Sequence, residues 1–318
     1  MTRARATSLL GLGGLLVLVA AVALGIGTSQ IDLLAVVRLE PLVLGVRLPR
    51  VLLAALAGAG LSVAGVAFQA LLRNPLADPY VVGVSGGAAV GGVIALVLGL
   101  SSAWALPLFA FGGAVASVLL LFYLAHAYGK SDPLTLLLIG VVFNSFAAAV
   151  VTFFKAVVTP TKAQEILYWL MGVIGVEAAP TLAALAVYVA VGTGALVVLA
   201  GALNLLSLGD DEATGLGLSA NRARLACFLA AALLVGAVVA VAGMIGFVGL
   251  VVPHVLRRLG GADHRWLLPA SALTGAAFLI AADAVARLTF YFFGTELPVG
   301  AVTAFTGGPF FLGLLLRR

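Results

Sequence analysis

Long apolar stretches follow one another along almost the whole chain, and a membrane-spanning helix needs about 20 such residues. Nine stretches are plain, at 8–28, 48–72, 80–100, 104–128, 134–156, 180–206, 225–244, 266–288 and 298–316. Apolar residues make up 63% of the 318 residues, charged residues only 9%, and the mean hydropathy is +1.24. These values exclude a soluble globular protein and predict an all-α integral membrane protein with many spans.

A tenth segment, Ile245 to Leu256, is ambiguous because it is short and is interrupted by Pro253 and His254. Hydropathy alone predicts a re-entrant or buried segment there. If the segment crosses, the arginines that follow it fall on the same side as most other Lys and Arg residues, as the positive-inside rule prefers. We therefore expect ten transmembrane helices with both termini in the cytoplasm.

The N-terminal segment, Met1 to about Gly27, has the outline of a signal peptide, with arginines before an apolar run. The run is long enough to span a membrane, and no clear small-residue cleavage site follows it. We interpret it as the first span rather than as a cleaved signal.

Turn-forming pairs interrupt the apolar pattern in RNPLADPYVVGVSGGAAVGG, residues Arg73 to Gly92. Asn74-Pro75 and Asp78-Pro79 are unfavourable inside helices and typical of turns. The chain is therefore expected to reverse here, and by itself the string indicates no more than an ordinary turn between two helices.

The longest polar connection, 207–224, is the best candidate for a functional loop. Asp210, Asp211 and Glu212 are placed to begin a short helix at its positive end, and Gly215 and Gly217 to end or bend it. The alternative is a merely solvated loop.

Catalytic and metal-binding patterns are weak in this sequence. Gly129-Lys130-Ser131 matches only the end of a phosphate-binding loop, and an apolar helix precedes it where that motif needs a strand. The three histidines are scattered, so we expect no catalytic residue, metal ion or cofactor. Asp283 and Arg287 have the i,i+4 spacing of an ion pair within one helix.

Four long blocks and one short one resemble the FecCD family of permeases, which are membrane subunits of ATP-driven importers for iron–siderophore, haem and cobalamin. The blocks are RLPR (Arg47 to Arg50), Arg73 to Gly92, Gly209 to Arg224, Ile245 to Leu288 and Glu296 to Leu316. The resemblance implies one transmembrane domain over 1–318 with the type II ABC importer permease fold. The similar segments that begin at Arg47 and Asn221 lie five crossings apart, which favours inverted structural repeats.

The resemblance also implies roles for named residues. Contact with the ATPase is implied for the coupling residues Asp211, Glu212, Ala213, Thr214, Gly215, Leu216, Gly217 and Leu218. A cytoplasmic gate is implied at Asn74, Leu76, Pro133 and Leu134, and a periplasmic gate region at Tyr168, Trp169 and Gly172. Docking of a binding protein is implied at Arg47, Arg50 and Arg287.

Two of these roles have plainer alternatives. The amphipathic stretch Gln164 to Ile174, which contains the periplasmic gate region, is also typical of a helix on the membrane surface. The three docking arginines lie on the outer side against the positive-inside trend, and lipid headgroups are an alternative partner for them.

The implied assembly is a homodimer in the lipid of a bacterial inner membrane, with two cytoplasmic ATPase subunits and a periplasmic or lipid-anchored substrate-binding protein. The net charge of +5 is read as a topology signal, not as a nucleic-acid site. A secondary transporter driven by an ion gradient is the first alternative, but only Asp283 lies deep in a span. A membrane enzyme is the second, and it needs clustered acidic or histidine residues that the sequence does not supply.

Overall fold

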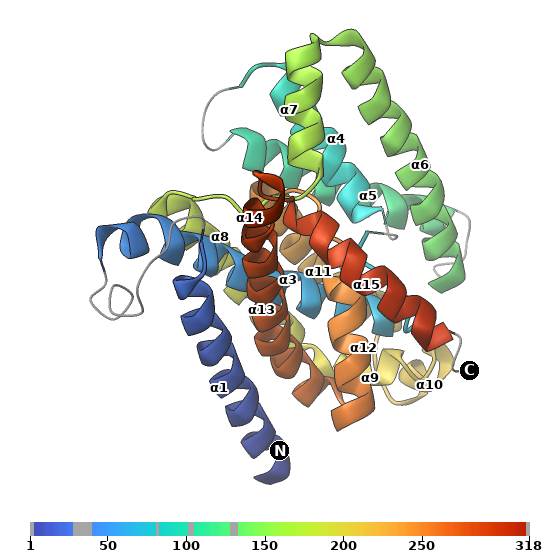
Figure 1. Cartoon of the computed structure of the whole chain (residues 1–318). Coiled ribbons are helices and arrows are strands. Elements are labelled where there is room, and N and C mark those ends of the chain that lie inside the picture. Colours follow the sequence, from blue (N-terminus) through green and yellow to red (C-terminus); the bar gives the residue numbers. More distant parts are fainter. Residues whose placement is uncertain (1–2, 28–39, 81–82, 101–104, 128–132, 316–318) are drawn as a thin grey trace.

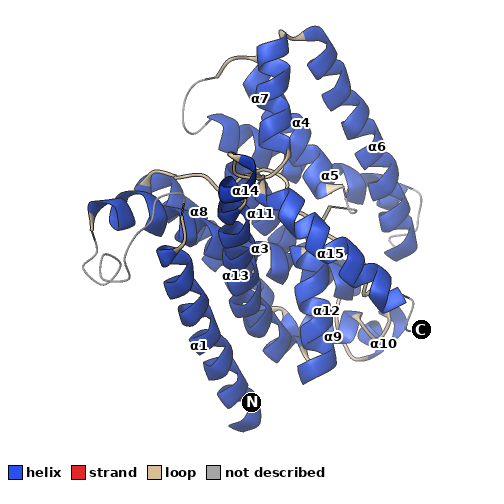
Figure 2. Ribbon diagram, in the orientation of Figure 1, coloured by secondary structure: helices blue, strands red, loops and turns tan. Residues whose placement is uncertain are grey.

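The computed structural model describes residues 3–27, 40–80, 83–100, 105–127 and 133–315. Figure 2 shows helices joined by loops, and no strand occurs in these ranges. The all-α prediction is confirmed. Lys130 of the Gly129-Lys130-Ser131 string lies outside the described residues.

The helices follow the predicted spans closely (Figure 1). In chain order they are α1 (Arg3–Gly25), the π-helical turn η1 (Val43–Arg47), α3 (Leu48–Leu71), α4 (Val84–Val97), α5 (Ala105–Ala127), α6 (Pro133–Val157), α7 (Pro160–Leu170), α8 (Ala179–Val198), α9 (Ala200–Leu206), α10 (Asp210–Gly215), α11 (Ala220–Ala242), α12 (Val248–Gly260), α13 (His264–Leu288), α14 (Phe290–Phe293) and α15 (Val299–Leu315).

Not all of these helices are long enough to cross a bilayer. Seven helical stretches in the described part have the necessary length and apolar composition, while Val84–Val97 and Val299–Gly313 are apolar but shorter. Helix α12 has 13 residues, which corresponds to about 20 Å at 1.5 Å per residue. By length and composition, seven of the described helices are candidate spans, and the predicted count of ten is not confirmed.

Helices α3 and α11 form the centre of the bundle. Their apolar stretches are 78% and 72% buried, whereas those of α1 and α6 are 6% and 17% buried. In the folded chain α3 contacts α8, α11, α12 and α13. The outer helices expose apolar side chains such as Leu10, Val142 and Phe146. A membrane protein has this distribution because lipid, not water, surrounds its outer helices.

Glycine lets the backbones of the central helices approach one another. A Cβ atom on Gly58 would meet the carbonyl oxygen of Gly275 in α13, and one on Gly275 would meet that of Gly58. A Cβ atom on Gly65 would meet the backbone of Gly249 in α12. Small residues at such crossings allow close van der Waals packing, which drives helix association where lipid removes the hydrophobic effect.

Two helices begin inside the protein rather than at its surface. Gly83 precedes α4 with φ 92° and Phe247 precedes α12 with φ 69°, so both chain segments turn sharply before the helix starts. The two entry segments also meet, because the amide of Ile245 donates to the hydroxyl of Tyr80 at 2.5 Å. Non-helical backbone at membrane depth is tolerated when it is buried in protein in this way.

Substitution of Gly65 by valine tests the importance of the α3–α12 crossing. The added side chain would overlap the backbone of Gly249, so we expect the free energy of unfolding to fall by about 1–3 kcal/mol. Thermal unfolding of the purified chain in detergent, followed by circular dichroism, measures this loss. Gly194→Val on α8 is the matched control, because no atom lies within 4 Å of its Cβ position. Equal melting temperatures for the two variants would contradict the prediction.

Candidate functional site

The predicted short helix in the 207–224 connection is present as α10, at the lower end of the bundle in Figure 1. Its first turn carries Asp210, Asp211 and Glu212, and acidic groups are favourable at the positive end of a helix. The carboxylate of Glu212 lies against Gly209, the residue before the helix. Ala213 is buried, whereas the apolar side chain of Leu216 is 65% exposed. Helix α10 therefore presents an uncovered, partly apolar surface on the outside of the bundle.

Asp210 joins α10 to two other parts of the chain. Its Oδ1 atom accepts hydrogen bonds from Arg73, which follows α3, and from Arg224 in α11. Asp210 is not among the predicted coupling residues, and its pairing with the two arginines was not predicted. No local pattern could have revealed the contact, because Arg73 and Asp210 are 137 residues apart.

The predicted cytoplasmic gate residues lie in two separate segments. Asn74 and Leu76 belong to the turn after α3, where the side-chain oxygen of Asn74 accepts from the amide of Leu76 at 2.9 Å. Pro133 and Leu134 begin α6, and Leu134 is 63% exposed. Pro75 and Pro79 lie in two successive turns, as predicted for the Asn-Pro and Asp-Pro pairs.

The lower end of the bundle also holds the start of α1. Asp263 precedes α13, and its carboxylate accepts from Asn204 at 3.0 Å and from Arg5 of α1 at 2.5 Å. The hydrogen bond from Asn204 is the main reason that the pKa of Asp263 lies below its ordinary value. Because Asn204 belongs to α9, which leads into α10, the N-terminal end of α1 and α10 lie at the same end of the molecule.

The predicted periplasmic gate region lies at the opposite end, around α7 (Figure 1). The predicted amphipathic stretch 164–174 is not a single helix, since α7 begins at Pro160 after the capping residue Thr159 and ends at Leu170. Tyr168 is 57% exposed. The ring of Trp169 packs over Gly92 of α4, and Gly172 follows the helix with φ 74°. Trp169 and Gly172 therefore pack inside the fold, and only Tyr168 projects outward.

An ion-pair cluster occupies the N-terminal end of α3. The guanidinium of Arg50 contacts Asp283 of α13 at 2.9 Å and Glu296 at 2.8 Å. Arg287 lies 3.1 Å from Asp283 one helical turn away, so the predicted i,i+4 pair is confirmed. The Asp283 side chain is 1% exposed, and two arginines neutralise its charge away from water.

Arg47 and Arg287 also bind the C-terminal end of α1. Arg47 donates to the carbonyl of Leu24 at 2.8 Å, and Arg287 donates to that of Ala23 at 3.0 Å. Helix ends leave such carbonyls without partners inside the helix, and cations near a C-terminus are favourable.

The three predicted docking arginines therefore come together, but groups of this chain occupy them. Arg47 and Arg287 are 5% and 3% exposed. In this structure both side chains are bound to carbonyls of α1. Arg50 keeps 16% of its side chain exposed and Glu296 keeps 32%.

A hollow of about 380 Å³ with several polar groups runs between α4 and α6. Asn144, Thr152 and Lys155 line it from α6, and Tyr80 and Ser85 line the other side. These residues of α6 were not predicted as a site. Their spacing is nevertheless a usable signal, because positions 144, 148, 152 and 155 lie on one face of a helix. Polar residues in a span most often face a cavity or a pathway.

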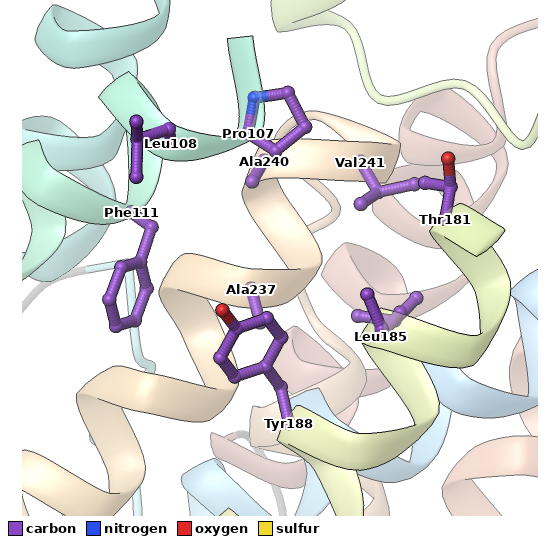
Figure 3. Close-up of a pocket in the computed structure, with 10 residues that line it drawn as sticks. Pro107, Leu108, Phe111, Thr181, Leu185, Tyr188, Ala237, Ala240 and Val241 are labelled. Carbon is purple, nitrogen blue, oxygen red and sulfur yellow. The ribbon is translucent and has the colours of Figure 1, made fainter. Parts of the chain in front are cut away.

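A second hollow, of about 150 Å³, is almost wholly apolar and lies between α5, α8 and α11 (Figure 3). Phe111 and Tyr188 stack beside it with ring centroids 5.7 Å apart. Exposed apolar residues such as Leu108 surround it, as expected for a surface in contact with lipid. Within the described residues, no group of three or more His, Cys, Asp or Glu side chains is placed to hold a metal ion.

Removal of the buried carboxylate tests the cluster at the N-terminal end of α3. In Asp283→Ala, Arg50 and Arg287 lose their shared counter-charge, so we expect the free energy of unfolding to fall by about 3–5 kcal/mol. Thermal unfolding in detergent measures the loss. Glu165→Gln breaks the more exposed pair with Lys162 and should change stability by only about 0.2–1 kcal/mol. Similar effects of both substitutions would show that the buried cluster contributes no more to the free energy of unfolding than an exposed ion pair does.

The sequence is similar to known membrane permeases along most of its length. Residues 15–317 match the model of the FecCD transport family. The vitamin B12 import system permease protein BtuC of Vibrio cholerae is 45% identical over 88% of this chain and 84% of its own length. The hemin transport system permease protein HmuU of Yersinia pestis is 41% identical over 86% of this chain and 83% of its own length.

Solved structures give the same result. A metal-chelate type ABC transporter in an inward-facing conformation is 34% identical, with a TM-score of 0.88 over 99% of both chains. The PsaBC complex of Streptococcus pneumoniae is only 16% identical, with a TM-score of 0.59 over 87% of this chain and 91% of its own, and it supports the fold alone. Since the family model covers nearly the whole sequence, the chain belongs to the FecCD transport family.

Proposed function

We propose that this chain is the permease subunit of an ATP-driven importer that moves an iron chelate, haem or a corrinoid into the cytoplasm. It works as a homodimer in a bacterial inner membrane, with two ATPase subunits below it and a substrate-binding protein above it. The permease changes between outward-open and inward-open states and makes or breaks no covalent bond.

The observation that carries the proposal is the similarity along nearly the whole chain to permeases named for these substrates. A haem permease and a vitamin B12 permease match 86% and 88% of the sequence. A ferric citrate permease of Bacillus subtilis, YfmD, is 40% identical over 84% of the chain. These relatives share a transport role but differ in substrate, so we leave the substrate among these three classes.

Ten crossings remain our proposal for the topology. Helix α12 has 13 residues, and the five residues between α11 and α12, 243–247, are not helical. The segment 243–260 therefore has 18 residues, which lies within the range of about 17–25 residues that a crossing needs.

The packing of the helices supports inverted repeats. If α3, α4, α5 and α6 correspond to α11, α12, α13 and α15, each contact in one half has a counterpart in the other. Helix α4 packs on α5 and α6 as α12 packs on α13 and α15, and α5 packs on α11 as α13 packs on α3. Helices α3 and α11 then pack on each other as the two central members.

We assign contact with the ATPase to α10 and the residues after it, 211–218. Within this range the exposed Leu216 offers an apolar contact, and Asp211 and Glu212 offer negatively charged ones. Asn74, Leu76, Pro133 and Leu134 form the proposed gate at the same end.

The polar hollow beside α6 is the best candidate for part of the substrate pathway. Helix α6 exposes large apolar side chains, including Val142 and Phe146, so it lies at the edge of one protomer. In a homodimer a second copy placed against α6 would close the open side of the hollow. Tyr168, Trp169 and Gly172 lie near its outer end, where we propose the periplasmic gate.

Docking of the binding protein is proposed at the outer end of α3. Arg50 and Glu296 supply the exposed charges there, while Arg47 and Arg287 hold α1 beneath them. Electrostatic docking of this kind should weaken with salt, because exposed charges are screened.

Reconstitution tests the proposed function. Proteoliposomes that contain this chain, its partner ATPase and its binding protein should take up haem, ferric citrate or cyanocobalamin only when ATP is supplied. The permease alone should hydrolyse no ATP, and the detergent complex should contain two copies of each membrane and ATPase chain. Uptake driven by an ion gradient without the ATPase would instead identify a secondary transporter.

Substitutions in α10 test its proposed role in coupling. In Glu212→Lys a positive charge replaces the carboxylate at the positive end of the helix, and in Gly215→Pro the ring distorts its last turn. We expect each variant to lower substrate uptake per ATP hydrolysed by about fivefold or more. Membrane insertion should be unchanged. Gly201→Ala on α9, where the added Cβ has only an ordinary contact, is the control. Wild-type uptake per ATP in both variants would indicate that α10 is merely solvated.

A further inference from the structure

The carboxylate of Asp210 is shared by two cations from distant parts of the chain. Arg73 follows the last turn of α3 and Arg224 lies in the first turns of α11, and both donate to the same oxygen. The Arg224 side chain is 2% exposed, whereas those of Asp210 and Arg73 are each 35% exposed. Asp210 therefore links α10 at the surface to one arginine inside the bundle and one at its edge.

Arg73 continues directly into the proposed gate turn. Its backbone has φ 47°, a left-handed conformation that is unusual for a residue other than glycine. The next residues are held by short-range hydrogen bonds, from the Asn74 amide to the Gln69 carbonyl at 3.1 Å and from the Ala77 amide to the Asn74 carbonyl at 3.0 Å. Because these hydrogen bonds hold residues 73–77 in one compact turn, a displacement of Arg73 should move the whole turn.

The same end of α3 is tied to α12. The side-chain amide of Gln69 donates to the carbonyls of Gly249 and Leu250 at 3.2 and 3.3 Å. Its oxygen accepts from Arg257 at 2.9 Å. Hydrogen bonds and the short stretch of chain from Gln69 to Asn74 therefore connect α10, through the end of α3, with α12.

We propose that Asp210 is a positioning residue that transmits movement of α10 to the gate turn at Arg73–Ala77 and, through Gln69, to α12. The inference rests on the proposed coupling role of α10. It assigns a function to Asp210, which directly precedes the residues 211–218 that we propose to contact the ATPase. Energetic coupling between Asp210 and Arg73 is measured by substituting each residue alone and both together.

A competing explanation is purely electrostatic. Asp210 lies in the first turn of α10, where an acidic group stabilises the helix, and it neutralises the buried Arg224. On this explanation the contact with Arg73 is incidental, and loss of Asp210 affects stability but not the link to the gate.

A double-mutant cycle separates the two explanations. The variants are Arg73→Gln, Asp210→Asn and the double variant, each assembled with the ATPase and the binding protein in proteoliposomes. Uptake of the substrate that the wild-type complex transports is measured per ATP hydrolysed, together with the melting temperature. Arg222→Gln is the matched control, because Arg222 is an exposed arginine in the same region and lies outside the proposed path.

We expect Arg73→Gln and Asp210→Asn each to lower uptake per ATP by about fivefold or more, with ATPase assembly intact. The double variant should be no worse than the more impaired single variant, because both remove the same link. Arg222→Gln should behave as the wild type.

Two results would overturn the inference. One is wild-type uptake per ATP in Arg73→Gln, and the other is losses in the double variant that equal the product of the single losses. Since Arg73 is at the protein edge, this single variant keeps the test decisive even if Asp210→Asn fails to fold. Failure of the wild-type complex to transport would instead reject the proposed function.

Discussion

Helix α3 packs so closely against α12 and α13 that its position sets the arrangement of the other central helices. Gly58 and Gly65 bring the backbones of α13 and α12 into contact with it, at crossings where a larger side chain has no room. With 24 residues, α3 extends for about 36 Å. Its two ends therefore reach both sides of a bilayer, and each end carries one of the polar clusters.

In each of the two clusters a carboxylate is neutralised by two arginines, but the carboxylates differ in exposure. A charge inside an apolar bundle is unfavourable unless an opposite charge or a hydrogen bond accompanies it. At one end Asp283 is enclosed between Arg50 and Arg287 and is almost inaccessible. At the other end Asp210 is part-exposed between Arg73 and Arg224. The first arrangement is suited to hold α1 and α13 together, and the second to respond to a partner at the surface.

The hollows between the helices differ in a way that bears on transport. The one between α5, α8 and α11 is lined mainly by apolar side chains, with Thr181 and Tyr188 as its polar members, and exposed apolar residues such as Leu108 border it. The one beside α6 carries Asn144, Thr152 and Lys155 along one helical face. Of the two, the hollow beside α6 carries more polar groups, which is why we propose it as part of the substrate pathway.

The membrane class, the approximate positions of the long helices and the family blocks could be predicted from the amino-acid sequence, because apolar runs, turn pairs and helix-start residues act within short distances along the chain. The sequence also predicted α10 and the pairing of Asp283 with Arg287, which are local features. Three features became visible in the folded chain alone: Arg47 and Arg287 are buried against α1, Asp210 contacts Arg73, and the face of α6 that carries Asn144 borders a hollow. These contacts join residues far apart in sequence, and burial depends on the packing of whole helices, so no local pattern specifies them.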